Sequence, residues 1–395
     1  LSSVLGNEVT AIISVSSTKV FIFAGTTIYI FNPFTHSTTT LGTFASEVVQ
    51  NAYYFNGYVY FASATKLGRI DASTNAVTNS WATFTQSPTV RPMVVLDNIL
   101  YIGNGKHIAL VYKAPAFIDN ALIFRDEFSV RALYGRGNEL YIGLSSTLET
   151  AECLAVRWNT WSEQYSAETI IPEDDIISFI STGGRFFILT SSTYGARVYQ
   201  YSEPDCVYYC SLPTTTVGVG VSIPHNAVAE WNGRTYIGLV GQTGSLGGVY
   251  SFGSPLPSGN PVFAYEYDMP GLASSCGTGI TVTSIGAAKN TIYWGFACYT
   301  GSPAYARGVA SIGTGRCSQW ALQSSVIQMA RGDTKLPQML LYFSSKNSNA
   351  TAIATVGDSY NSGQYTLLEN LPNQMFESPF FKESSNHSIY VAGSN

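Results

Sequence analysis

The stretch RALYGRGNELYIGLSS (Arg131–Ser146) contains two strand-like runs that are joined at Gly135–Asn138, and its second run includes the letters LYIG. Similar stretches stand upstream in MVVLDNILYIGNG (Met93–Gly105) and downstream in AVAEWNGRTYIGLVG (Ala227–Gly241). Val, Ile, Leu and Tyr in short runs favour strands, whereas Gly, Asn and Asp between such runs favour tight turns. The chain therefore repeats one predicted β-hairpin.

The second strand of this hairpin recurs nine times along the chain, at spacings of 38 to 57 residues. Repeats of about 40 to 50 residues that consist only of strands are typical of propeller blades. The nine occurrences are Lys19–Ala24, Tyr58–Ala62, Ile99–Gly103, Glu139–Gly143, Arg185–Thr190, Arg234–Gly238, Thr291–Gly295, Leu340–Ser344 and Ser388–Ala392.

Each repeat supplies four candidate strands, and turn residues such as Asn56-Gly57 and Asn232-Gly233 join the first two. These dipeptides tolerate the positive φ angles of two-residue hairpins. The sequence contains eight complete units and a ninth that stops after two strands. We therefore predict an all-β propeller of about eight four-stranded blades, with seven or nine as alternatives. Residues 1–395 are expected to form one domain, in which residues 375–395 close the ring or begin a following region.

The composition is rich in apolar residues and poor in charge. Hydrophobic residues make up 45% of the 395 residues and charged residues only 11%, against about 25% in an ordinary soluble domain. The net charge is −5, without a basic cluster, which disfavours binding to nucleic acid. No apolar run is long enough for a transmembrane helix. A surface rich in Ser, Thr, Gly and Tyr suits an extracellular protein.

The six cysteines do not have metal-site spacing. Cys206 and Cys210 are expected to flank a turn and can form a local disulfide bridge. Cys276 and Cys298 are expected on loops of one face and are a second candidate pair. The alternative is that all four are small buried apolar residues.

No catalytic motif is recognised in the chain, and no catalytic residue, metal site or cofactor is expected. The four histidines are scattered over different units. Acidic residues in PEDD (Pro172–Asp175) and RDE (Arg125–Glu127) lie in loops that lead to inner strands. Paired carboxylates there would suit glycoside hydrolysis, although adjacent acids in a loop are more often solvated turn residues.

The most prominent remaining feature is a possible recognition surface. Loops that share one face of a propeller lengthen in several repeats and carry Tyr among small polar residues, which is the contact chemistry of adaptable binding loops. Ordinary solvated loops whose tyrosines pack on neighbouring blades are the alternative. The candidate binding residues are Tyr194, Tyr299, Tyr305 and His107.

The middle of the chain resembles uncharacterised propeller proteins that are encoded among the structural genes of tailed phages. The stretches that carry the resemblance are Arg91–Tyr112, Val130–Ser146, Val156–Tyr165 and Gly247–Gly253, within roughly Ser87–Gly313. The resemblance implies a non-enzymatic component exposed on the virion, in the tail or its fibres. It supplies no catalytic residues.

We therefore expect a non-enzymatic binding or structural module, located on a virion or otherwise extracellular, that contacts a host-surface glycan or protein or a neighbouring virion protein. One alternative is a propeller glycan hydrolase or lyase with carboxylates at the ring axis. Another is a cellular surface adhesin without a viral origin.

Overall fold

The computed structural model describes most of the chain as strands and tight turns, and no helix is found among the described residues. These are residues 5–35, 37–44, 47–148, 152–192, 195–212, 222–240, 248–254, 260–268, 280–288, 291–299, 305–311, 319–323, 327–328, 339–342, 351–358, 364–368, 375–378 and 386–394. The chain divides into two compact units, residues 1–263 with 267–312, and residues 264–266 with 313–395.

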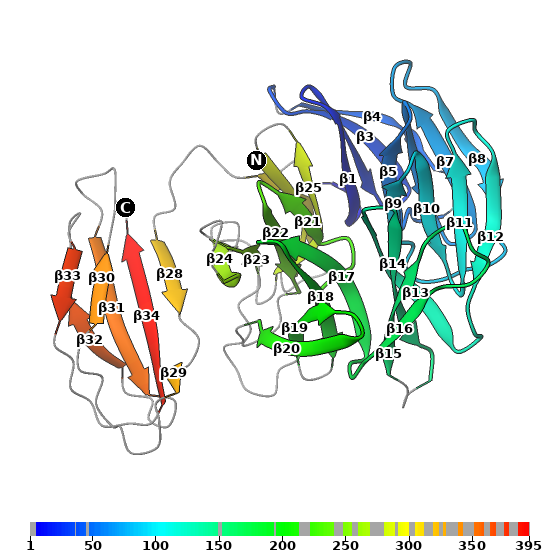
Figure 1. The fold of residues 1–395 in the computed structure, drawn as a ribbon. Coiled ribbons are helices and arrows are strands. Elements are labelled where there is room, and N and C mark those ends of the chain that lie inside the picture. The colour runs from blue at the N-terminus through cyan, green and yellow to red at the C-terminus, as the bar shows by residue number, and fades with distance from the viewer. Residues whose placement is uncertain are drawn as a thin grey trace. The chain divides into compact units, whose positions relative to one another are not determined.

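The first unit consists of seven successive antiparallel sheets, which we call blades 1 to 7 (Figure 1). Blades 1 to 3 contain β1 (Val9–Ser16), β2 (Lys19–Ala24), β3 (Thr27–Asn32) and β4 (Ser37–Thr43); β5 (Asn51–Phe55), β6 (Tyr58–Ala62), β7 (Lys66–Asp71) and β8 (Val77–Thr83); and β9 (Met93–Leu96), β10 (Ile99–Asn104), β11 (His107–Tyr112) and β12 (Phe117–Ile123). Blades 4 and 5 contain β13 (Phe128–Arg136), β14 (Glu139–Ser146), β15 (Cys153–Trp158) and β16 (Ala167–Ile171); and β17 (Asp175–Thr182), β18 (Arg185–Ser192), β19 (Gly195–Ser202) and β20 (Asp205–Ser211). Blades 6 and 7 contain β21 (Val228–Trp231), β22 (Arg234–Leu239), β23 (Gly248–Gly253) and β24 (Val262–Asp268); and β25 (Ile280–Ala288), β26 (Thr291–Tyr299) and β27 (Tyr305–Ser311).

The sequence of each strand reflects its place in the blade. The second strands, which carry the repeated apolar motif, are buried along almost their whole length because both of their faces pack on neighbouring blades. The fourth strands are polar and largely exposed, as in the Ser- and Thr-rich β4. This gradient from an apolar interior to a polar rim explains why the repeat is clearest in the second strand.

The core lies between the blades rather than inside any one of them. One buried cluster joins blades 3 and 4, another joins blades 4 and 5, and others join blades 1 and 2, 2 and 3, and 6 and 7. Phe187 of blade 5 packs edge-on against Phe252 of blade 6. Each large apolar side chain buried in this way contributes about 1.5 to 3 kcal/mol, so the blades stabilise one another.

The ring closes between blade 7 and blade 1. A buried cluster combines Val9 and Ile12 of β1 with Tyr293 of β26 and Val309 of β27, and the Leu5 amide donates to the Arg307 carbonyl at 2.8 Å. The prediction of an all-β propeller is confirmed. The ring has seven blades, which is one of the two alternatives to the predicted number of about eight.

The glycine that ends several of the repeated strands has a packing role. A Cβ on Gly143 would lie 2.7 Å from the Ile176 side chain of the next blade, and one on Gly238 would lie 2.3 Å from Val282. At the ring closure, a Cβ on Gly295 would lie 2.5 Å from Val9 of blade 1. These glycines are therefore seats, positions without a side chain that accommodate an apolar residue near the start of the following inner strand.

The predicted hairpin turns are present between the first two strands of the blades. Asn56-Gly57 and Asn232-Gly233 have positive φ at both residues, and so do Asp97-Asn98 and Gly183-Gly184. At Gly137-Asn138 only the glycine has a positive φ. The turn chemistry of the sequence thus fixes most of these hairpins.

The second unit does not continue the blade pattern that the sequence predicted. Its strands are β28 (Gln319–Gln323), β29 (Ile327–Gln328), β30 (Met339–Tyr342), β31 (Thr351–Asp358), β32 (Gln364–Leu368), β33 (Met375–Ser378) and β34 (Asn386–Ser394). The last two were expected to form a hairpin, but β33 pairs with β30, and β34 pairs with β28, β29 and β31. An apolar strand motif identifies a strand without fixing its partner. Because the structure describes the ring and this unit separately, a single domain over residues 1–395 stays a prediction.

Candidate binding site in the axial channel

The first strand of every blade lies at the ring axis, and together these strands surround a cavity of about 600 Å³. Each of β1, β5, β9, β13, β17, β21 and β25 is the first strand of its sheet and contributes lining residues. We call this cavity the axial channel. Its start face is the end of the channel at which the first, inner strand of each blade begins. Its turn face is the opposite end, where a hairpin turn joins each inner strand to the second strand. The volume is that of a typical small-molecule site.

Arg131, Asp175 and His225 form a hydrogen-bonded cluster toward the start face of the axial channel. Arg131 Nε donates to Asp175 Oδ1 at 2.9 Å, and its Nη2 donates to Oδ2 at 2.7 Å. His225 Nε2 lies 2.9 Å from Asp175 Oδ2 and 2.9 Å from Arg131 Nη2. The Ser145 hydroxyl donates to Asp175 Oδ1 at 2.6 Å. Three blades thus contribute the central groups of the cluster.

The partners of Asp175 determine its protonation state. Burial raises the pKa of its carboxyl, but hydrogen bonds from His225 and Arg131 outweigh this effect and hold the pKa well below its usual range. A carboxylate offers about four lone-pair sites, and the four contacts with Arg131, Ser145 and His225 occupy them. Asp175 is therefore an ionised structural anion.

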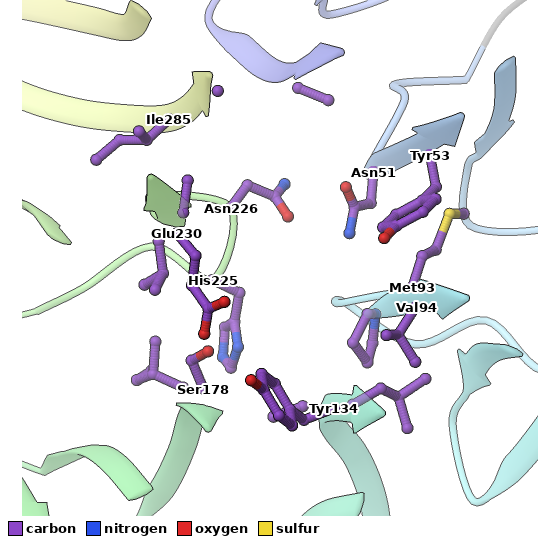
Figure 2. Close-up of a pocket in the computed structure, with 18 of the residues that line it drawn as sticks. Asn51, Tyr53, Met93, Val94, Tyr134, Ser178, His225, Asn226, Glu230 and Ile285 are labelled. Atoms are coloured by element: carbon purple, nitrogen blue, oxygen red, sulfur yellow. The ribbon is translucent and has the colours of Figure 1, made fainter. Parts of the chain in front are cut away.

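Two asparagines face each other across the channel near the same face (Figure 2). Asn226 of the segment before β21 donates through Nδ2 to the Gln50 carbonyl at 2.5 Å, which links blades 6 and 2. Asn51 donates through Nδ2 to the Arg91 carbonyl at 3.0 Å. These bonds fix the amides while leaving both side chains in the lining of the channel.

Glu230 and Tyr134 form a second polar group, closer to the turn face, and Tyr53 faces the channel from β5. Glu230 precedes Trp231, the last residue of β21, and its side chain is open to the channel. Desolvation raises the pKa of Glu230, and hydrogen bonds from the Ser181 backbone and the Tyr134 hydroxyl offset this only in part. Figure 2 shows the Glu230 carboxylate and the Tyr134 hydroxyl pointing toward the same part of the cavity.

The two tyrosines stay neutral over a wide pH range. Desolvation raises the pKa of Tyr53 and of Tyr134, and the negative charge of Glu230 raises both further. The Tyr53 hydroxyl also accepts a hydrogen bond from the Val95 backbone. Tyr134 therefore presents an uncharged hydroxyl beside Glu230, whereas Tyr53 presents its hydroxyl from β5 on the other side of the channel (Figure 2).

Among the four binding residues predicted from the sequence, the structure describes the side chain of His107 alone, and His107 does not line the channel. Tyr194 lies outside the described residues. The backbones of Tyr299 and Tyr305 pair with each other at the ends of β26 and β27, and their side chains lie outside the described part. His107 begins β11 and is buried, and desolvation lowers its pKa. Recognition by these four residues stays a prediction.

The local disulfide bridge that the sequence suggested is not formed. Cys206 and Cys210 are both free and both belong to β20, rather than flanking a turn. Four residues along a strand span roughly 13 Å, well beyond the Cα separation that a disulfide requires. Cys276 and the side chain of Cys298 lie outside the described residues, so that pair stays a prediction.

The acidic motifs of the sequence have different roles. In PEDD, Asp175 joins the channel cluster, and Glu173 is buried where it accepts hydrogen bonds from Arg197 Nη1 at 2.7 Å and the Tyr199 hydroxyl at 2.5 Å. In RDE, Arg125 forms exposed ion pairs with Glu127 and Glu168. No motif in the sequence pointed to Glu230, which lies in the short strand β21.

The described residues contain no group of three or more His, Cys, Asp or Glu side chains that could hold a metal ion. Within the same part of the chain, no helix has the length and apolarity needed to cross a bilayer.

No protein-family model matches the chain, and no curated protein matches it. Solved structures do share its fold. The extracellular domain of a one-component system from B. thetaiotaomicron is similar with a TM-score of 0.53 and 13% identity, over 85% of this chain and 42% of that chain. A chain of the mitotic checkpoint complex gives a TM-score of 0.50 and 10% identity, over 76% of this chain and 89% of the other. This chain thus spans less than half of the bacterial domain, and at these identities the likeness concerns the fold alone.

Proposed function

We propose that this protein is a non-enzymatic binding module that receives a ligand group in the axial channel from its start face. We further propose that it is an external part of a phage virion, in the tail or its fibres, and that it contacts a host-surface glycan or a neighbouring virion protein. The resemblance of Arg91–Tyr112 and Val130–Ser146 to phage-encoded propellers supports the location. The low content of charged residues is consistent with an extracellular environment.

The observation that carries the binding proposal is the polar lining of the axial channel. Side chains from separate blades reach the cavity, among them Asn51, Tyr134, Asn226 and Glu230. Small-molecule sites combine such a cavity with a few convergent polar groups. The ring also holds Asn51, Tyr134 and Glu230 on inner strands, which position them more rigidly than loops do.

The hydrogen bonds that the Asp175 carboxylate already accepts favour a binding function over glycoside hydrolysis. A glycosidase of the common kind needs one carboxyl group as acid and a second, free carboxylate as nucleophile or base. Glu230 has the raised pKa that suits an acid. Asp175, however, accepts hydrogen bonds from Arg131, Ser145 and His225 on both oxygens and has no free lone pair for attack.

The test is a binding assay with the full chain on a glycan array and on a panel of intact bacterial cells, with release of reducing sugar measured in parallel. We expect saturable binding to one glycan class or cell type, competition by the same free glycan, and no sugar release. Absence of binding to every surface, or release of sugar, would contradict the proposal.

Two matched variants locate the binding surface. Asn226→Leu removes an amide from the channel, whereas Asn120→Leu makes the same change on the exposed face of the outer strand β12. We expect surface binding to fall in Asn226→Leu and to be unchanged in Asn120→Leu. Equal binding by both variants would exclude the channel as the contact site.

A further inference from the structure

Glu230 is a carboxylate in the axial channel without a cationic partner. Among the residues that the structure describes, no Lys, Arg or His lies within ion-pair distance of its oxygens. Its two hydrogen-bond partners, the Ser181 backbone and the Tyr134 hydroxyl, are neutral. The carboxylate, which is exposed to the cavity, therefore has no counter-charge within the described part of the chain.

The other charges of the channel do not compensate Glu230. Arg131 is the cationic residue among the described lining, and its guanidinium is held by Asp175 through two hydrogen bonds. The charges of Arg131 and Asp175 cancel, so Glu230 gives the channel a net negative charge. A cleft whose charged groups have one sign concentrates ions of the opposite charge.

The surroundings of Glu230 suit the hydrogen-bonding groups of an ammonium ion. An ammonium ion has three N–H donors and no acceptor. Glu230 supplies a charged acceptor, and the Tyr134 hydroxyl, which points toward the same part of the cavity (Figure 2), supplies a neutral one. The inner strands β5, β13 and β21 are also edge strands of their sheets, and edge strands carry unpaired backbone carbonyls.

A metal ion and an anion fit this group of residues less well. Divalent cations such as Ca²⁺ and Mg²⁺ require six or more oxygen ligands, usually with more than one carboxylate. Here one carboxylate is combined with a neutral phenol. An anionic ligand would be repelled by Glu230, because Arg131 is already neutralised.

We propose that the axial channel binds a protonated primary amine, with the Glu230 carboxylate as counter-ion and the Tyr134 hydroxyl as a hydrogen-bond acceptor. This inference rests on the proposed function, since it names the ligand group that the same channel receives. The ammonium group of an amino sugar and that of a lysine side chain share this chemistry.

The test uses isothermal titration calorimetry of the full chain at pH 7.5 and low salt with three probes of equal size: n-butylammonium, n-butanol and n-butyrate. We expect n-butylammonium to bind with 1:1 stoichiometry and at least tenfold more tightly than the neutral and anionic probes. Glucosamine and Nα-acetyl-lysine amide, titrated separately, distinguish the two sources of the amine. Equal affinity for n-butanol, or no heat with any amine, would overturn the inference without requiring a variant.

Glu230→Gln and Glu163→Gln remove the same charge from different places. Glu163 lies exposed in the turn between β15 and β16, so its variant is the control. We expect Glu230→Gln to weaken n-butylammonium binding at least tenfold and Glu163→Gln to leave it unchanged. Because desolvation disfavours the charge of Glu230, the Gln variant should melt no lower than the wild type at pH 7.5, which verifies its fold.

The outcomes separate this inference from the proposed function. Binding to glycans or cells without binding to any amine would refute the amine site and leave the binding module intact. Amine binding that depends on Glu230, without binding to any surface, would refute the proposed contact role and leave the amine site intact. An affinity for n-butylammonium that is unchanged in Glu230→Gln would refute the assignment of Glu230.

Discussion

Arg131 on β13 and Asp175 on β17 form a two-pronged ion pair between blades 4 and 5, with Nε–Oδ1 and Nη2–Oδ2 distances of 2.9 and 2.7 Å. His225 of the segment before β21 joins the same carboxylate. The pair connects inner strands of neighbouring blades at the start face, where the strand edges have no partner strand. Its contribution is therefore both to the stability of the ring and to the shape of the axial channel.

Removing the charge of Asp175 should destabilise the ring. Asp175→Asn leaves the mostly buried Arg131 guanidinium without a counter-charge, and we expect the free energy of unfolding to fall by about 2 kcal/mol. Urea denaturation followed by tryptophan fluorescence measures this loss. Glu168→Gln, which breaks an exposed ion pair with Arg125, is the control and should change stability by no more than about 0.5 kcal/mol. Equal losses would show that burial of the pair is unimportant.

The same pair predicts how stability depends on pH. The pKa of Asp175 is lower in the folded chain than its unfolded value of about 3.9, so folding favours the ionised form. The stabilisation is fully present above about pH 5 and is lost as the pH falls below about 4 toward the folded pKa. The difference in unfolding free energy between wild type and Asp175→Asn should therefore shrink between pH 5 and pH 3. A difference that stays constant over this interval would speak against the ion pair.

The glycine seats between blades predict a second effect on stability. In Gly238→Ala, the new methyl group would overlap the Val282 side chain, with Cγ1 at 2.3 Å and Cβ at 2.6 Å, and would lie 3.1 Å from Ala227 Cβ. Overpacking of this kind costs about 1 to 3 kcal/mol. The control is Gly42→Ala on β4, where a Cβ would meet no atom within 4 Å. If thermal unfolding showed equal stability for the two variants, the close packing of β22 on blade 7 would be wrong.

The thiols of β20 should react slowly in the folded protein. Burial raises the pKa of both Cys206 and Cys210 to about 12, and only the thiolate is nucleophilic. Iodoacetamide at pH 8 should label them after unfolding but leave them largely unmodified in the native chain, as peptide mass spectrometry would reveal. A non-reducing digest that contains a Cys206–Cys210 disulfide would refute the assignment of free thiols.

The fold was largely predictable because its determinants are local. The alternation and turn chemistry of Val130–Ser146 specify a hairpin, and its recurrence specifies blades that must pack on one another. The hairpin predicted within Arg131–Ser146 is formed by β13 and β14. The number of blades was less predictable, because the strand motifs at Leu340–Ser344 and Ser388–Ala392 resemble the repeated strand but do not determine which strands they pair with. The contact of Val9 with the Gly295 seat closes the ring between blade 1 and blade 7, and these two residues are far apart in the sequence.

The channel residues were harder to predict because the ring assembles them from distant positions. Arg131 and Asp175 are 44 residues apart, and Arg131 and His225 are 94 apart. No motif links them, since Arg131, Asp175 and His225 lie at different positions relative to the repeated strand of their blades. The acidic motif drew attention to Asp175, but not to the partners that occupy its oxygens. Glu230 is significant only because the ring brings Tyr134 beside it.

A crystal structure of the full chain grown with n-butylammonium tests the central claim most directly, since it examines ring closure and channel occupancy together. The account predicts seven blades with Val9 seated on Gly295, and the ammonium group bound at Glu230. An additional blade from residues 313–395 between blades 7 and 1, or an axial channel without the amine, would contradict it.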